Sequence, residues 1–194
     1  AQPALMAVSV ALVRTLEREG GKRLSDIAAF VAGHSLGEYS ALAGSGALGL
    51  ADTARLLRRR GEAMQAAVPL GEGAMAALLG LDIPDVEAVV AQAAAVGIVA
   101  IANDNTPGQV VVSGAVRAVE RAVELAKERG ARRAIMLDVS APFHCPLLEP
   151  AARAMQEALG VIVLDEPSVP LIANVTAAPV TDPDLIRKLL VDQV

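Results

Sequence analysis

The residues with the clearest chemical potential form a five-residue segment, Gly33-His34-Ser35-Leu36-Gly37. It fits the pattern G-x-S-x-G, in which a strand turns sharply into a helix and leaves a serine exposed at the apex. Flanking glycines tolerate the strained backbone and the close packing of such a turn. Ser35 would then lie at a helix N-terminus, where the free N–H of Leu36 can stabilise a negatively charged oxygen. The pattern predicts Ser35 as a nucleophile and Leu36 as an oxyanion donor.

A serine nucleophile needs a base that takes its proton. The chain has two histidines, His34 and His144. His34 adjoins the serine, so at a sharp turn its side chain should point away from it. His144 follows a predicted strand in a Pro-Phe-His loop, and loops at strand ends often carry catalytic groups. We therefore predict His144 as the base, and Asp104, Asp138 or a backbone carbonyl as the group that orients it.

An arginine cluster on a predicted helix could bind an anionic substrate; its members are Arg55, Arg58, Arg59 and Arg60. A guanidinium that points into a cleft binds a carboxylate through two parallel hydrogen bonds. Arg60 stands directly before Gly61, whose small size leaves room beside it. A solvated helix face is the ordinary role of such arginines, and residue type and spacing do not choose among the four.

The elements that must position these groups alternate between helices and strands. The apolar run Ile27–Ala32 is typical of a buried parallel strand, and it leads into the serine turn. Helices are predicted at Pro3–Glu19, Leu36–Leu42, Asp52–Ala67, Leu147–Leu159 and from Asp184 onward, with a strand region at Pro167–Val175. The first of these has the apolar pattern of a buried helix. These segments predict an α/β core formed by residues 1–72 and 140–194.

Residues 73–139 have a different pattern, which predicts a small inserted subdomain. Strands are expected at Ala74–Leu79, Ile98–Ala102, Gln109–Ser113 and Arg133–Val139, with helices at Pro84–Ala95 and Val116–Arg129. The resulting β-α-β-β-α-β order is that of ferredoxin-like folds.

Composition excludes several classes of protein. The formal net charge is −5 and only three residues are aromatic, so the chain lacks the basic groove and the aromatic platforms of a nucleic-acid-binding protein. Cys145 is the single cysteine, which excludes internal disulfides and a Cys-based zinc site, and the presence of only two histidines argues against a His-rich metal site. No run of about 20 strongly apolar residues predicts a membrane span. We expect no metal, no nucleic acid, no membrane and a cytoplasmic location.

Several separate blocks, all in register, resemble the malonyl-CoA–acyl carrier protein transacylase family. The segment Gly33–Ala41 is similar to the family's nucleophile motif, and the resemblance extends over essentially the whole chain. The other blocks are Gln2–Leu5, Arg60-Gly61 with Met64-Gln65, Gly73–Ala77, Asn105–Val111 and Pro142–His144.

This resemblance implies a hydrolase-like α/β core with a parallel sheet, plus the ferredoxin-like subdomain. It implies that Ser35 becomes malonylated, that His144 acts as general base and acid, and that Leu36 donates to the oxyanion. Arg60 would pair with the malonyl carboxylate, and Phe143 would disfavour methylmalonyl groups. The implied partners are malonyl-CoA and acyl carrier protein, in fatty acid biosynthesis, with no cofactor and a monomeric enzyme.

The departures from the family pattern concern the two ends. Family members have an N-terminal Gly-Gln-Gly-Ser-Gln-type loop that contributes an oxyanion donor, and a later Gly-Pro-Gly-type loop, and neither occurs here. We expect that the sequence lacks both termini of the family's domain, with the residue that holds the histidine lying beyond Val194, and that this piece has reduced activity alone.

Three other interpretations stay open. A serine hydrolase or esterase would share the serine turn, and Ser35, Asp138 and His144 have its chain order. However, an acid only six residues before the histidine is unusual, and the β-α-β-β-α-β insert stays unexplained. An acyltransferase domain of a polyketide or fatty acid megasynthase would share the fold. A non-catalytic relative is disfavoured because Ser35, His144 and Arg60 are all present.

Overall fold

The computed structural model describes residues 1–194, which divide into two compact units. The first unit comprises Ala1–Ala63 and Ala152–Gln193, and the second comprises Met64–Ala151 together with Val194. The division predicted from the sequence set residues 73–139 apart from the rest. Both divisions keep the β-α-β-β-α-β segment whole.

A three-stranded sheet lies in the first unit. It contains β1 (Val31–Ala32), β6 (Leu171–Ile172) and β7 (Pro179–Val180), in the order β1-β6-β7. β1 and β6 are parallel, whereas β6 and β7 are antiparallel. The α/β class is confirmed, but the sheet is mixed and not wholly parallel as expected.

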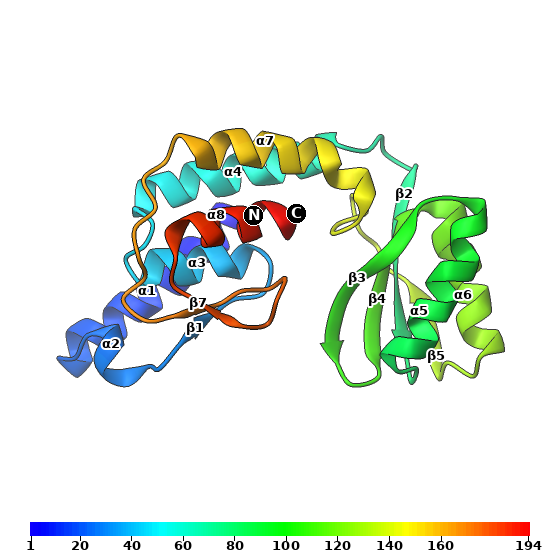
Figure 1. The fold of residues 1–194 in the computed structure, drawn as a ribbon, viewed down its shortest axis with the longest axis horizontal. Coiled ribbons are helices and arrows are strands. Elements are labelled where there is room, and N and C mark those ends of the chain that lie inside the picture. The colour runs from blue at the N-terminus through cyan, green and yellow to red at the C-terminus, as the bar shows by residue number, and fades with distance from the viewer. The chain divides into compact units, whose positions relative to one another are not determined.

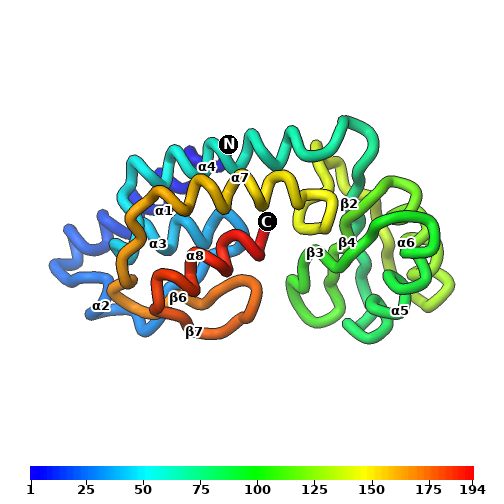
Figure 2. Tube along the Cα trace, turned by 45° about the horizontal axis from the view of Figure 1, so that its top comes forward, coloured from blue at the N-terminus to red at the C-terminus, as the bar shows by residue number.

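Helices make up most of the first unit (Figure 1). They are α1 (Gln2–Gly20), α2 (Leu24–Ile27), α3 (Leu36–Gly44), α8 (Pro183–Asp192), most of α4 (Leu50–Ala66) and most of α7 (Glu149–Gly160). Figures 1 and 2 both show α4 and α7 running side by side. An ion pair between Arg59 Nη2 and Glu157 Oε2, 3.1 Å apart, joins these two helices.

The strand before the serine turn is shorter than the sequence pattern predicts. Ile27 belongs to α2, because Asp26 accepts a hydrogen bond from the backbone N–H of Arg23 and so caps a short helix there. Phe30, which the sequence indicated as core, is 51% exposed and lines a cavity of about 390 Å³ beside β1.

One face of α1 is apolar and exposed, contrary to the expected buried helix. Met6 and Val10 are buried, and α1 packs on α3. The opposite side carries Leu5, Val8, Leu12 and Leu16, each more than half exposed. None of the helices combines the length and the apolar character that crossing a membrane requires.

The second unit contains the element order β-α-β-β-α-β that the sequence pattern predicts. Its elements are β2 (Gly73–Leu79), α5 (Ile83–Ala93), η1 (Ala94–Val96), β3 (Val99–Thr106), β4 (Gln109–Ala115), α6 (Val116–Glu128), β5 (Arg133–Met136) and η2 (Pro146–Leu148). The strands pair in the order β3-β4-β2-β5, and every pair is antiparallel. The strand β3 continues to Thr106, four residues beyond the predicted end at Ala102.

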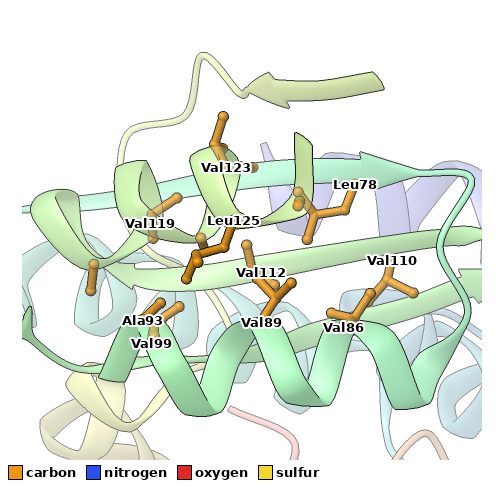
Figure 3. Close-up of a cluster of buried hydrophobic side chains, with 14 of the residues drawn as sticks. Leu78, Val86, Val89, Ala93, Val99, Val110, Val112, Val119, Val123 and Leu125 are labelled. Carbon is orange, nitrogen blue, oxygen red and sulfur yellow. The ribbon is translucent and has the colours of Figure 1, made fainter. Parts of the chain in front are cut away.

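A single apolar core joins the helices of this unit to its sheet. Side chains alternate along β2, so that Ala74, Ala76 and Leu78 point into the core. Figure 3 shows Val86 and Val89 of α5 in the same cluster as the labelled side chains of α6 and the sheet. The packed core gives the segment between residues 73 and 139 a rigid frame.

Candidate functional site

The serine turn has the strained backbone that its sequence predicts. Ser35 lies between the end of β1 and the start of α3, with φ 54° and ψ −112°. An L-residue with positive φ is uncommon, and such strain is concentrated at functional sites. Leu36 is the first residue of α3, so its N–H is not used within the helix. The serine and this N–H therefore face the same end of α3.

Only one of the two flanking glycines is sterically required. A Cβ on Gly33 would lie 2.0 Å from the carbonyl carbon of Gly37, which no side chain can do. A Cβ on Gly37 would meet nothing within 4 Å. The prediction that both glycines permit close packing is therefore right for Gly33 and wrong for Gly37.

Asn174, which sequence reasoning missed, clamps the backbone of the turn. It follows β6, whose parallel pairing with β1 brings it beside the turn. Its Oδ1 accepts from the Ser35 N–H at 2.6 Å, and its Nδ2 donates to the Gly33 carbonyl at 2.6 Å. One amide side chain thus bridges His34 and fixes the backbone that leads into the strained residue.

Among the four arginines, Arg60 alone enters the interior of the first unit. Arg55, Arg58 and Arg59 form exposed ion pairs with Asp52, Glu62 and Glu157. Arg60 is only 1% exposed, and its Nη2 donates to Ser35 Oγ at 3.0 Å. The structure therefore brings Arg60 and Ser35 together.

The buried Arg60 guanidinium is bonded to neutral groups only. Besides Ser35, it donates to Gln2 Oε1 at 3.0 Å and to Gln193 Oε1 at 2.8 Å, and its Nε has no partner. The Tyr39 ring centroid lies 5.8 Å from Cζ, a cation–π distance. Burial lowers the pKa of Arg60, while the charges of Tyr39 and Glu38 oppose that shift. A buried cation without a direct ion pair is suited to receive an anion.

A second buried charge, Glu38 in the first turn of α3, lies near this arginine. It is 1% exposed, and burial raises the pKa of its carboxyl group above the usual value, although hydrogen bonds from Gln193 and Asn174 partly oppose the shift. Gln193 Nε2 donates to Glu38 Oε2 at 2.6 Å, and the Asn174 N–H donates to Glu38 Oε1 at 3.3 Å. Sequence reasoning assigned no role to Gln2, Glu38 or Gln193, although Gln2 and Glu38 lie in blocks that resemble family motifs.

The two other predicted site residues, Phe143 and His144, belong to the second unit and are half-buried. Their loop is held within that unit: Gln65 Nε2 donates to the Ser140 carbonyl at 2.9 Å, and a Cβ on Gly73 would lie 2.3 Å from Pro142 Cγ. His144 has φ 58°, so it shares with Ser35 a conformation that L-residues rarely adopt. Asp104 and Asp138, the candidate orienting acids, are both exposed.

No group of three or more His, Cys, Asp or Glu side chains is placed to hold a metal ion. The groups that the structure assembles around Ser35 are instead a buried guanidinium, two amides and a helix N-terminus. This arrangement can hold an acyl group on an oxygen and bind a second, negatively charged end of that group. An α/β fold with a strained serine between a strand and a helix is typical of the class of enzymes that form an acyl-serine ester.

Comparison with known proteins gives the family. Residues 1–192 match the model of the acyl transferase domain, and the chain belongs to this family. It is 46% identical to the malonyl CoA-acyl carrier protein transacylase of Bacillus subtilis over 194 residues, which are 100% of this chain and 60% of the relative. The chain thus spans about three fifths of the length of the curated relatives that it matches.

Solved structures give the same result. The acyl-carrier-protein-S-malonyltransferase of Bartonella henselae has a TM-score of 0.97 and 57% identity, over 100% of this chain and 62% of that one. A malonyl-transacylase solved in complex with a type II PKS acyl-carrier protein has a TM-score of 0.94 and 43% identity, over 99% of this chain and 61% of that one.

Proposed function

We propose that this chain carries the serine site of an acyltransferase that moves a malonyl group from malonyl-CoA to the phosphopantetheine thiol of acyl carrier protein, in fatty acid biosynthesis. The observation that carries the proposal is the buried Arg60 guanidinium, whose Nη2 lies 3.0 Å from Ser35 Oγ. An acyl group on Ser35 would have its far end beside a cation that lacks an ion pair. A malonyl group has a free carboxylate at that end, and an acetyl group does not.

The reaction would proceed by covalent catalysis in two halves. His144 takes the Ser35 proton, Ser35 Oγ attacks the thioester carbonyl, and coenzyme A leaves as a thiol after protonation by His144. The phosphopantetheine thiol, deprotonated by His144, then attacks the malonyl-serine ester, and Ser35 regains its proton. The role of His144 rests on its Pro-Phe-His loop and on the family to which the chain belongs.

The oxyanion of each tetrahedral intermediate would accept a hydrogen bond from the Leu36 N–H at the start of α3. Arg60 would bind the malonyl carboxylate through two hydrogen bonds and so hold the ester carbonyl toward the thiol. The half-buried Phe143 would restrict the space for a branch on the acyl group. None of these steps calls for a metal or a redox cofactor, and we propose that the enzyme uses none.

The fold supports an assignment to two known architectures. We assign the first unit, with its strand–serine–helix turn, to a hydrolase-like core. We assign residues 73–139, with strand order β3-β4-β2-β5, to the ferredoxin-like fold. Malonyl-CoA and acyl carrier protein are the proposed partners, since the similar proteins are named for them.

Intact-protein mass spectrometry tests the proposal. The protein expressed from its natural reading frame, incubated with malonyl-CoA, should gain one malonyl group and lose it when acyl carrier protein is added. Ser35→Ala should gain none, because the attacking oxygen is absent. A malonyl adduct that persists in Ser35→Ala would refute the nucleophile assignment, and release to water as fast as to the carrier would favour a hydrolase.

A further inference from the structure

The buried carboxylate of Glu38 has no part in the steps above. We infer that Glu38 is a positioning residue, which acts through the side-chain amide of Gln193 to hold the Arg60 guanidinium ready for the substrate carboxylate. The inference rests on the proposed function of Arg60.

Four groups form a continuous chain of contacts across the first unit. Glu38 Oε2 accepts from Gln193 Nε2 at 2.6 Å, and Gln193 Oε1 accepts from Arg60 Nη2 at 2.8 Å. The same Arg60 nitrogen donates to Ser35 Oγ at 3.0 Å. Glu38, Gln193 and Arg60 are all less than 9% exposed, so water does not compete freely for these bonds. A change at Glu38 therefore reaches Arg60 through a single intervening side chain.

The carboxylate determines which way the Gln193 amide faces. An ionised carboxylate is only an acceptor, so the NH₂ end of Gln193 must face Glu38. That leaves the carbonyl end of Gln193 facing Arg60, whose guanidinium is only a donor. If the amide turned over, its NH₂ group would oppose Nη2 and displace the guanidinium. The second Gln193 Nε2 bond, to the Ser35 carbonyl at 3.1 Å, favours the same orientation.

The separation between the two charges is as important as their attraction. Glu38 is close enough for its charge to stabilise the protonated form of Arg60, yet it forms no ion pair with the guanidinium. A carboxylate in direct contact would occupy the nitrogens that an acyl carboxylate needs. The charge of Glu38 favours the protonated guanidinium, and the neutral amide between them leaves Arg60 available for the substrate carboxylate.

A purely structural role is the competing explanation. Glu38 lies in the first turn of α3, where a negative charge is favoured by the helix dipole, and it accepts from the Asn174 N–H. Removing the carboxylate would then lower stability and affect all substrates equally. The two explanations differ in whether selectivity for a carboxylate-bearing acyl group changes.

Two variants separate these explanations. Glu38→Gln removes the charge at nearly constant size. The double variant that combines Glu38→Gln with Gln193→Glu, called the exchange variant, keeps one amide and one carboxylate but places the carboxylate against Arg60. Glu62→Gln is the matched control, because Glu62 is exposed on α4 and pairs with Arg58. Each protein, expressed from its natural reading frame, is assayed for malonyl and acetyl transfer, thermal unfolding and the Gln193 side-chain NH₂ signals in NMR spectra.

We expect Glu38→Gln to lower malonyl transfer by about tenfold or more relative to acetyl transfer, since a hydrogen bond to a charged group is weakened. The exchange variant should not regain selectivity, because its carboxylate pairs directly with Arg60, and Glu62→Gln should match the wild type. Equal loss for both substrates, or recovered selectivity in the exchange variant, would overturn the inference.

The NMR signals test the contact independently of activity. The Gln193 NH₂ signals should move in Glu38→Gln and stay in place in Glu62→Gln; unmoved signals in Glu38→Gln would also overturn the inference. A wild type that accepts no malonyl group would refute the proposed function, a result distinct from any change at Gln193.

Discussion

Replacement of Arg60 should separate binding of the acyl carboxylate from stability of the fold. In Arg60→Met the side chain keeps an unbranched apolar stem and loses the guanidinium. The lost group is the one that lies 3.0 Å from Ser35 Oγ and is enclosed at 1% exposure. We expect malonyl transfer to suffer strongly, and acetyl transfer to suffer only through the lost contact with Ser35.

The magnitude follows from the two hydrogen bonds that a guanidinium gives to a carboxylate. A hydrogen bond to a charged group contributes about 1.5–3 kcal/mol, so two contribute roughly 3–6 kcal/mol. Since about 1.4 kcal/mol is a factor of ten in rate, kcat/KM for malonyl-CoA should fall by roughly 10²–10⁴. Loss of the one bond from the guanidinium to Ser35 Oγ should cost about 1.5–3 kcal/mol, so acetyl transfer should fall by only roughly 10–10².

Stability should change in a different way. The Arg60 Nε has no partner and the guanidinium has no ion pair, so its burial is costly. Arg60→Met removes that cost but leaves Gln2 Oε1 and Gln193 Oε1 without their donor and the buried Glu38 without a nearby cation, so we expect it to unfold at or somewhat below the wild-type temperature.

The assay measures acyl transfer from malonyl-CoA and acetyl-CoA with saturating acyl carrier protein, with thermal unfolding followed by circular dichroism. Arg58→Met is the control, because Arg58 lies on the same helix and forms only an exposed ion pair with Glu62. Equal losses for malonyl and acetyl transfer in Arg60→Met would refute the carboxylate role. So would a loss of the same size in Arg58→Met.

Three further changes test other parts of the structure. Gly33→Ala should cost several kcal/mol of unfolding free energy, since its Cβ would lie 2.0 Å from Gly37. Gly37→Ala has open space around the new Cβ and should raise the unfolding free energy by about 0.5–1 kcal/mol. Chemical denaturation measures both values, and equal effects would contradict the packing argument. Because burial raises the pKa of Glu38, the folded protein binds a proton at this carboxyl group more tightly than the unfolded protein does, so stability is lost as the pH rises above about 4.5. Glu38→Gln should lack this pH-dependent contribution. Parallel stability–pH curves for the variant and the wild type would contradict the argument. Phe143→Ser should raise the ratio of methylmalonyl to malonyl transfer by removing the ring, and an unchanged ratio measured by mass spectrometry would remove Phe143 from that role.

Local patterns predicted the parts of the molecule whose contacts are local. The amphipathic pattern of Val116–Arg129 predicted α6, and the short apolar run Ala74–Leu79 predicted β2, both within a residue or two of the observed ends. The serine turn was predictable for the same reason, because a sharp strand-to-helix change needs particular residues at fixed spacing.

The remaining site was not predictable because its contacts span the chain. Asn174 and Ser35 are 139 residues apart, and Gln193 and Glu38 are 155 apart. Neither Asn174 nor Gln193 stands in a pattern that marks its partner. Likewise, spacing alone could not choose Arg60 among four neighbouring arginines, since only packing shows which of them is buried.

The contact between Asn174 and the serine turn has a consequence for synthesis of the protein. A ribosome completes the G-x-S-x-G segment long before it reaches residue 174, so the growing chain carries Ser35 without the amide that fixes its backbone. Gln193, which links Glu38 and Arg60, arrives later still. The serine turn and the buried guanidinium therefore receive their full set of side-chain contacts only after residue 193 has been synthesised.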